Sequence, residues 1–112
     1  SVLHVSYAKL PMIVGAELHI GSEVTVGHKV LLHGCRVGNQ CLIGMGSIVM
    51  DNAVIEDQVI LGAGSLVTPG KRLESGFLYF GSPAKKIRPL TDAETTNLMT
   101  SAIHYVALKQ RY

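Results

Sequence analysis

Aliphatic residues recur every six positions along the middle of the chain, with a single step of five between Leu32 and Val37. These anchors are Ile20, Val26, Leu32, Val37, Ile43, Val49, Ile55, Leu61 and Val67. A fixed period of six is typical of hexapeptide solenoids, in which each repeat supplies one short strand and one corner. The pattern therefore predicts an all-β solenoid, a parallel β-helix, over residues 20–67. An α-helix is excluded because apolar residues do not recur at three and four positions.

Small residues accompany the anchors at fixed offsets. Glycine follows five of them directly, at Gly21, Gly27, Gly38, Gly44 and Gly62. We expect these glycines at corners, where φ is often positive and a Cβ would clash. A small or aliphatic residue stands four positions after most anchors, at Val24, Val30, Cys41, Ser47, Ala53, Val59 and Ser65. Both the anchors and this second set are predicted to face the core.

Two regions are predicted, a β-helix over residues 1–90 and a C-terminal α-helix over 91–112. Within the first, residues 1–5 form a short strand and about 6–18 form a loop, although Val14 lies in phase with Ile20. Residues 81–84 form a turn, followed by a basic connector at 85–88.

The C-terminal helix is predicted from its start signal and its apolar stripe. Thr91 followed by Glu94 is a capping box, which marks a helix N-terminus. The apolar stripe consists of Leu98, Met99, Ala102, Ile103 and Val106. We expect this helix to lie along the solenoid or on a neighbouring subunit.

Composition excludes several classes of partner. The formal net charge is +2 and no Lys/Arg cluster is interleaved with aromatic residues, so nucleic-acid binding is not expected. No apolar run approaches the roughly 20 residues of a membrane span. Cys35 and Cys41 do not form a C-x-x-C pair, and we expect small buried thiols in a reducing, cytoplasmic setting. Asp51, Glu56 and Asp57 are expected to form a solvated acidic edge.

Histidines supply the strongest chemical signal. His28 and His33 flank the short step in the period, and imidazole is the commonest zinc ligand in proteins. Five residues apart in a six-residue repeat, the two should be separated by a corner, so one ion could not easily bind both within a single chain.

His4 completes a possible ligand set. It precedes His33 by 29 positions, and removing a loop of about eleven leaves about 18, one whole coil. His4 and His33 could then stack on one face, with His28 contributed by a neighbouring subunit. This spacing predicts a metal site between the subunits of a cyclic homotrimer.

Longer motifs surround these histidines. They are SVLHV at His4, VGHKVLLHGC from Val26, IGMGSI from Ile43, ILGAGSLV from Ile60 and YFGSPAK from Tyr79. In these motifs the chain resembles the γ-class carbonic anhydrases and their bacterial homologues. The resemblance implies a left-handed β-helix trimer with Zn²⁺ held by His4 and His33 of one subunit and His28 of its neighbour. It also implies a lyase that hydrates CO₂ reversibly through zinc-bound hydroxide, with Tyr79 near the active site.

Two other classes fit the same residues. One is acyl transfer or metal-dependent thioester hydrolysis on a coenzyme A thioester, because such enzymes share the repeats and the GSPAK turn. The other is a non-catalytic trimeric scaffold that keeps zinc for cohesion. The absence of acidic residues between Ser6 and Ala16, where the best-known family members carry a proton-shuttle glutamate, favours the scaffold.

Overall fold

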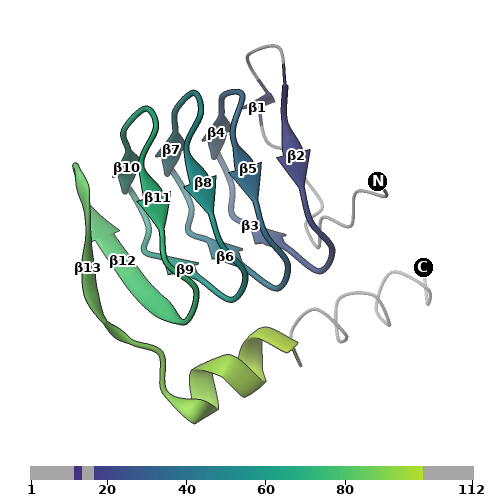
Figure 1. Ribbon diagram of the computed structural model, residues 1–112, viewed down its shortest axis with the longest axis vertical. Coiled ribbons are helices and arrows are strands. Elements are labelled where there is room, and N and C mark those ends of the chain that lie inside the picture. Colours follow the sequence, from purple (N-terminus) through teal and green to yellow (C-terminus); the bar gives the residue numbers. More distant parts are fainter. Residues whose placement is uncertain (1–11, 14–16, 100–112) are drawn as a thin grey trace.

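The computed structural model describes residues 12–13 and 17–99 of the 112-residue chain and shows a parallel β-solenoid of about three turns followed by one helix (Figure 1). The strands are β1 (Met12–Ile13), β2 (His19–Ile20), β3 (Thr25–Val26), β4 (Leu31–Leu32), β5 (Arg36–Val37), β6 (Leu42–Ile43), β7 (Ile48–Val49), β8 (Val54–Ile55), β9 (Ile60–Leu61), β10 (Leu66–Val67), β11 (Arg72–Leu73), β12 (Phe77–Gly81) and β13 (Ala84–Pro89). The predicted all-β solenoid with a C-terminal helix is confirmed.

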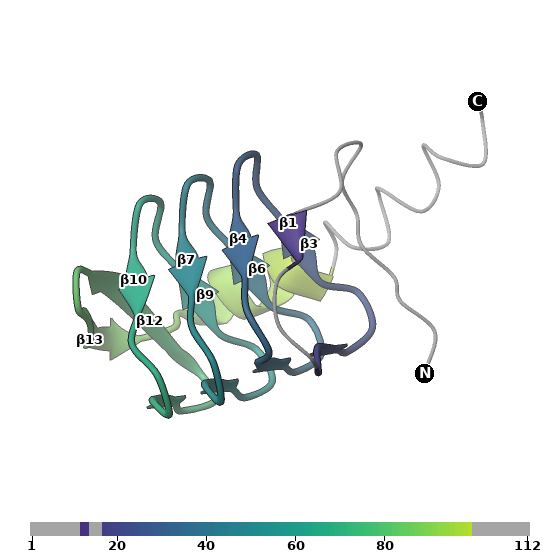
Figure 2. The same cartoon turned by 90° about the horizontal axis from the view of Figure 1, so that it is seen from above.

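Three sheets form the walls of the solenoid. The first contains β1-β4-β7-β10, the second β2-β5-β8-β11, and the third β3-β6-β9-β12-β13. Within each wall the solenoid strands run parallel, and each strand pairs with its equivalent one coil later (Figure 2). Thr25 pairs with Leu42, and Leu42 with Ile60. The first of these coils is thus 17 residues long and the second 18.

The core is the stack of inward-facing residues that the six-residue period predicted. All nine anchors are buried, with Ile20 the most exposed at 5%. The second predicted set is buried as well, and Cys35 and Leu73 join the core. Side chains at both inward positions of each repeat therefore form continuous columns, and the predicted columns are confirmed.

The corner glycines meet one of the two predicted requirements, since a Cβ would clash there, but their φ angles are not positive. A Cβ on Gly44 would lie 2.5 Å from the backbone nitrogen of Ala63 in the next coil, so close approach of the coils requires glycine there. Positive φ occurs two positions further along the corner instead. The residues concerned are Glu23, Lys29, Gln40, Gly46, Asn52, Gln58, Gly64, Gly70 and Gly76.

One corner is shorter than the others. Between the inward residues Leu32 and Cys35 lie only His33 and Gly34, whereas the next coil has Met50, Asp51 and Asn52 at this place. Neither His33 nor Gly34 has a positive φ. The five-residue step in the sequence is therefore a corner that lacks its left-handed residue.

Two segments differ from the sequence prediction. β1 lies inside the predicted loop and pairs with β4, with Ile13 beside Leu32. The predicted basic connector at 85–88 is part of β13, which pairs antiparallel with β12 and closes a hairpin. Since β12 continues the third sheet, β13 covers the edge that β12 would otherwise expose.

The helix spans residues 92–99 within the described part of the chain and runs back along the solenoid (Figure 1). Its capping box is formed, since the Glu94 amide donates to Thr91 Oγ1 at 3.1 Å and the Thr91 amide to Glu94 Oε1 at 2.8 Å. Leu98 is buried as predicted, but Met99 is exposed rather than part of the stripe. Ala102, Ile103 and Val106 lie outside the described residues. No helix in the described residues is long and apolar enough to cross a membrane.

Replacing Gly44 with alanine tests the close approach of the coils. We expect Gly44→Ala to destabilise the fold by about 3 kcal/mol, because the new Cβ meets backbone that cannot move aside. Gly46→Ala is the matched control, since its Cβ would meet nothing within 4 Å and only the positive φ is strained. It should cost about 1 kcal/mol in urea unfolding. Equal losses for both variants would contradict this account.

Acid should weaken the start of the helix. Both Arg88 guanidinium nitrogens donate to the Glu94 carboxylate, at 2.7 and 2.8 Å, and with the Thr91 amide they lower the Glu94 pKa from 4.5 to about 2. Because this pKa is lowered in the folded state, the stabilisation is present above pH 4.5 and is lost as pH falls toward 2. The protection factors of the amides at residues 92–96, which correct for the intrinsic pH dependence of hydrogen exchange, should fall over that range. In Glu94→Gln, these protection factors should be low already at neutral pH and change little with acid.

Candidate metal centre

His33 begins the short corner that follows β4. Its amide donates to the Val49 carbonyl at 2.8 Å, so its backbone is held by the next coil. The side chain is 25% exposed, and Nδ1 lies 3.8 Å from Asp51 Oδ1. The same carboxylate oxygen accepts the Gly34 amide at 3.0 Å. The imidazole is thus half-buried, with one ring nitrogen beside a carboxylate.

His28 occupies the corner at the other end of β4. It is exposed, and its carbonyl accepts the Gly46 amide at 2.9 Å, which fixes its backbone on the coil above. The sequence argument expected a corner between His28 and His33, whereas the strand β4 lies between them and each histidine occupies a corner of its own. No cluster of three or more His, Cys, Asp or Glu that could hold a metal is found in residues 12–13 and 17–99.

An apolar strip lies between the two histidine corners. It consists of the outward side chains of β4, β7 and β10, which are Leu31, Ile48 and Leu66 and stack from coil to coil. Ile48 is 36% exposed and the other two are half-buried. Met45, in the corner stacked on that of His28, is 59% exposed. By contrast, the second sheet presents His19, Arg36, Val54 and Arg72. The first sheet is therefore a wall with aliphatic outward side chains and a histidine corner at each end of β4.

The structure describes the strand beside β4 but not His4, which was predicted to lie on that strand. His4 itself lies outside the described residues. The strand that stacks beside β4 is β1, whereas the spacing argument assigned that position to the strand carrying His4. This pairing contradicts the spacing argument for stacking His4 on His33, whereas the role of His4 as a metal ligand stays a prediction.

Tyr79 lies away from His33 in the same chain. It belongs to β12 on the third sheet, where it pairs with Leu61 and is buried. Its phenol oxygen accepts the Glu74 amide at 2.9 Å, which ties the last corner of the solenoid to the core. These contacts give Tyr79 a structural role, and its place near an active site stays a prediction.

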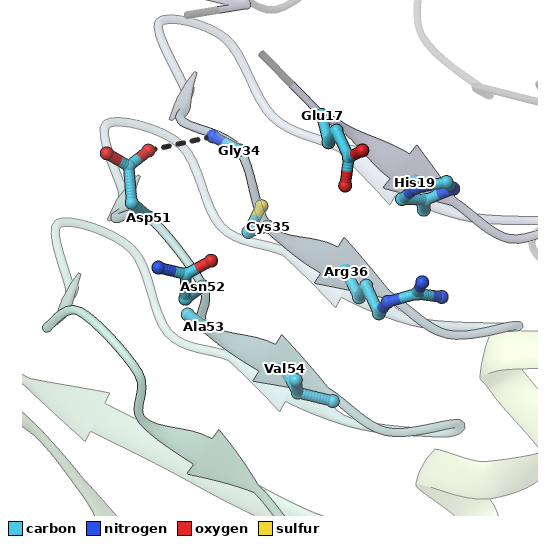
Figure 3. A pocket seen from close by; sticks show the side chains of 9 residues that line it. All are labelled: Glu17, His19, Gly34, Cys35, Arg36, Asp51, Asn52, Ala53 and Val54. Carbon is cyan, nitrogen blue, oxygen red and sulfur yellow. Dashed lines mark hydrogen bonds between the residues drawn. The ribbon is translucent and has the colours of Figure 1, made fainter. Parts of the chain in front are cut away.

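The acidic residues are not simply a solvated edge, as the sequence suggested. Asp51 accepts the Gly34 amide, Asp57 the Asn39 amide and Glu56 the Ser75 amide, each in an adjacent coil. Asp51 also lines a hollow of about 410 Å³ on the second-sheet side of the short corner, with His19 and Arg36 at its other end (Figure 3). The role of Asp51 beside a histidine was missed because residues 18 positions apart become neighbours only when coils stack.

The two cysteines are unsuited to ligate metal. Both are buried, as predicted, and burial raises the pKa of the Cys35 thiol to about 11 and that of Cys41 to about 12. Because a metal binds the thiolate, these neutral thiols act as small core residues.

Comparisons with known proteins agree with this architecture. Residues 34–69 match the family described as bacterial transferase hexapeptide (six repeats). Protein YrdA of Escherichia coli K12 is 56% identical over 112 residues, which is all of this chain and 61% of YrdA. Mitochondrial gamma carbonic anhydrase 2 of Arabidopsis thaliana is 43% identical over 91 residues, 81% of this chain and 33% of the plant protein. The resemblance to γ-carbonic-anhydrase-like hexapeptide proteins is confirmed.

A solved structure extends the comparison to the fold. The hexapeptide transferase family protein from Anaplasma phagocytophilum has a TM-score of 0.87 and 46% identity, covering 91% of this chain and 61% of that one. This hexapeptide chain therefore spans about three fifths of the length of YrdA and of the Anaplasma protein. The activity and partners of the whole protein are therefore proposals.

Substituting Tyr79 separates its two possible roles. Tyr79→Phe should lower the free energy of unfolding by about 1–2 kcal/mol, because the Glu74 amide loses its acceptor. Zinc uptake, measured by elemental analysis of the purified protein, should be unchanged. Unchanged stability with reduced CO₂ hydration would instead place Tyr79 at the active site.

Proposed function

We propose that this chain is the subunit of a zinc-dependent, carbonic anhydrase-like homotrimer that hydrates CO₂ reversibly. The observation that carries the proposal is the placement of His28 and His33 at the two ends of β4, one on each side of the apolar strip. If that strip packs against a neighbour, the His28 corner of one subunit meets the His33 corner of the next around a closed ring. His4, which the family resemblance implies as a ligand, would be the third.

The described donors fit zinc. His33 has Nδ1 3.8 Å from Asp51 Oδ1, which leaves Nε2 to bind zinc, and two or three imidazoles are a common zinc ligand set in catalytic sites. When bound, zinc lowers the pKa of water toward neutrality and so supplies a nucleophile for CO₂. The chain's own contribution is to hold the imidazoles on rigid backbone and to exclude water along the apolar strip. Relatives named as gamma carbonic anhydrases support this function.

A second candidate is acyl transfer on coenzyme A thioesters. It is supported by the hexapeptide transferase match at residues 34–69 and by the similarity to the Anaplasma hexapeptide transferase family protein. A single general-base histidine would suffice for that chemistry, so it would survive removal of zinc. Carbonic anhydrase activity, by contrast, would be lost when zinc is removed. CO₂ hydration and acetyl-coenzyme A turnover, each measured before and after chelation, separate the two candidates.

Mixed trimers test the sharing of ligands between subunits. His28→Ala and His33→Ala proteins should each bind no zinc, because every interface lacks one ligand. Trimers assembled from both parents contain one interface with His33 from one parent and His28 from the other. Each mixed trimer should therefore bind one zinc ion, against three in the wild type. With the two parents tagged differently, native mass spectrometry of the mixed trimers counts the subunits from each parent and the zinc ions bound.

His19→Ala is the matched control, since His19 lies on the second sheet away from the strip. It should retain all three zinc ions. Mixed trimers that form but carry no zinc would contradict the intersubunit assignment. Retention of full zinc by either single variant would contradict the assignment of that histidine.

A further inference from the structure

Asp51 is placed to act on His33 from the neighbouring coil. The two residues are 18 positions apart, and their side chains meet only because the middle of the corner at 50–52 stacks on the short corner at 33–34. Asp51 Oδ1 lies 3.8 Å from His33 Nδ1 and accepts the Gly34 amide at 3.0 Å. The Asn52 amide donates back to the Gly34 carbonyl at 2.8 Å. These two hydrogen bonds clamp the carboxylate beside the imidazole.

Amide capping alone does not account for a charged residue at this position. The same task is performed elsewhere in the solenoid by a neutral side chain, since Asn39 Oδ1 accepts the Ser22 amide at 2.9 Å. Asp57 Oδ1 accepts the Asn39 amide at 2.7 Å, and neither of the two stacked corners involved, 38–40 and 56–58, contains a histidine. Asp51 thus differs from the other capping residues in having an imidazole next to its carboxylate.

A carboxylate beside one ring nitrogen decides which tautomer a neutral histidine adopts. The lone pair of an unprotonated Nδ1 would face the negative charge of Asp51, whereas an Nδ1–H is attracted to it. The proton is then held on Nδ1, and Nε2 keeps its lone pair for a metal. A distance of 3.8 Å is too long for a hydrogen bond, so a small movement of the ring or carboxylate must close it on metal binding.

We propose that Asp51 is a positioning residue for the metal centre. It holds His33 in the Nδ1–H tautomer and orients its ring, so that Nε2 is the ligating atom. Metal-bound histidines commonly donate their other N–H to a carboxylate, and losing that partner weakens metal binding by about 10–100-fold. This inference rests on the proposed zinc site. The inference adds Asp51 to the proposed zinc site as a residue that touches neither metal nor substrate.

The short corner explains why this arrangement occurs only once among the described coils. With two residues instead of three, the corner places Gly34 directly after His33 and directly under Asp51. A Cβ on Gly34 would lie 2.9 Å from the Glu17 carbonyl, so glycine is required there. Because the short corner consists of His33 and Gly34 alone, it places no second side chain between the His33 imidazole and the Asp51 carboxylate.

Asp51→Asn tests the charge while keeping the acceptor for the Gly34 amide. Asp57→Asn is the matched control, the same change at a capping carboxylate on a different corner. In the metal-free protein at pH 8, ¹⁵N NMR of the wild type should show His33 protonated on Nδ1. Asp51→Asn should shift it toward the Nε2–H form, and Asp57→Asn should not. The zinc dissociation constant, from chelator competition, should rise about tenfold or more only in Asp51→Asn.

The outcomes separate this inference from the proposed function. If the wild type takes up no zinc, the proposed function fails, and the His33 tautomer still decides the role of Asp51. If the wild type binds zinc but its metal-free His33 is in the Nε2–H form, the inference is overturned. It is also overturned if the two variants bind zinc equally tightly. A lower melting temperature shared by both variants reports only the lost capping strength.

Discussion

Stacking of coils through backbone hydrogen bonds is the constraint on which the rest of this structure depends. At the strands, each coil donates amides to the carbonyls of the next coil, as Gly27 donates to Ile43 and Gly44 to Leu61. At the corners, amides donate back to the preceding coil, as Gly46 donates to His28. Consecutive coils therefore keep one spacing around the whole perimeter. At corners such as that of Gly44 a side chain has no room at the first position, and inward residues must form columns of similar size. The aliphatic anchors, the corner glycines and the scarcity of large aromatic residues follow from this single requirement.

The same constraint produces the geometry of the candidate site. Strands of two residues leave corners close to both ends of β4, so His28 and His33 are held on backbone that hydrogen bonds fix to the adjacent coil. The wall between them is apolar, and its centre at Ile48 is partly exposed. A rigid strip of this kind suits burial between identical subunits. Placing one histidine at each end lets every interface in a ring receive both.

Much of the fold could be predicted from the sequence, because the period alone identifies which residues face inward. The anchors from Ile20 to Val67 and the Thr91–Glu94 capping box needed no tertiary information. Features that arise between coils were not predictable in the same way. The clash that fixes Gly44 and the contact of Asp51 with His33 depend on stacking register, which a single deletion changes from 18 to 17 residues. β13 was taken for a connector because its exposed basic residues lack a core-facing pattern.

Native mass spectrometry of the zinc-loaded protein tests the central claim most directly, since it reads assembly and metal content in one spectrum. A site shared between subunits predicts trimers that carry three zinc ions. Collisional or acid-induced release of monomers should then yield subunits without metal, because no single chain holds a complete ligand set. Monomers that retain zinc, or trimers that assemble fully without binding it, would contradict the account.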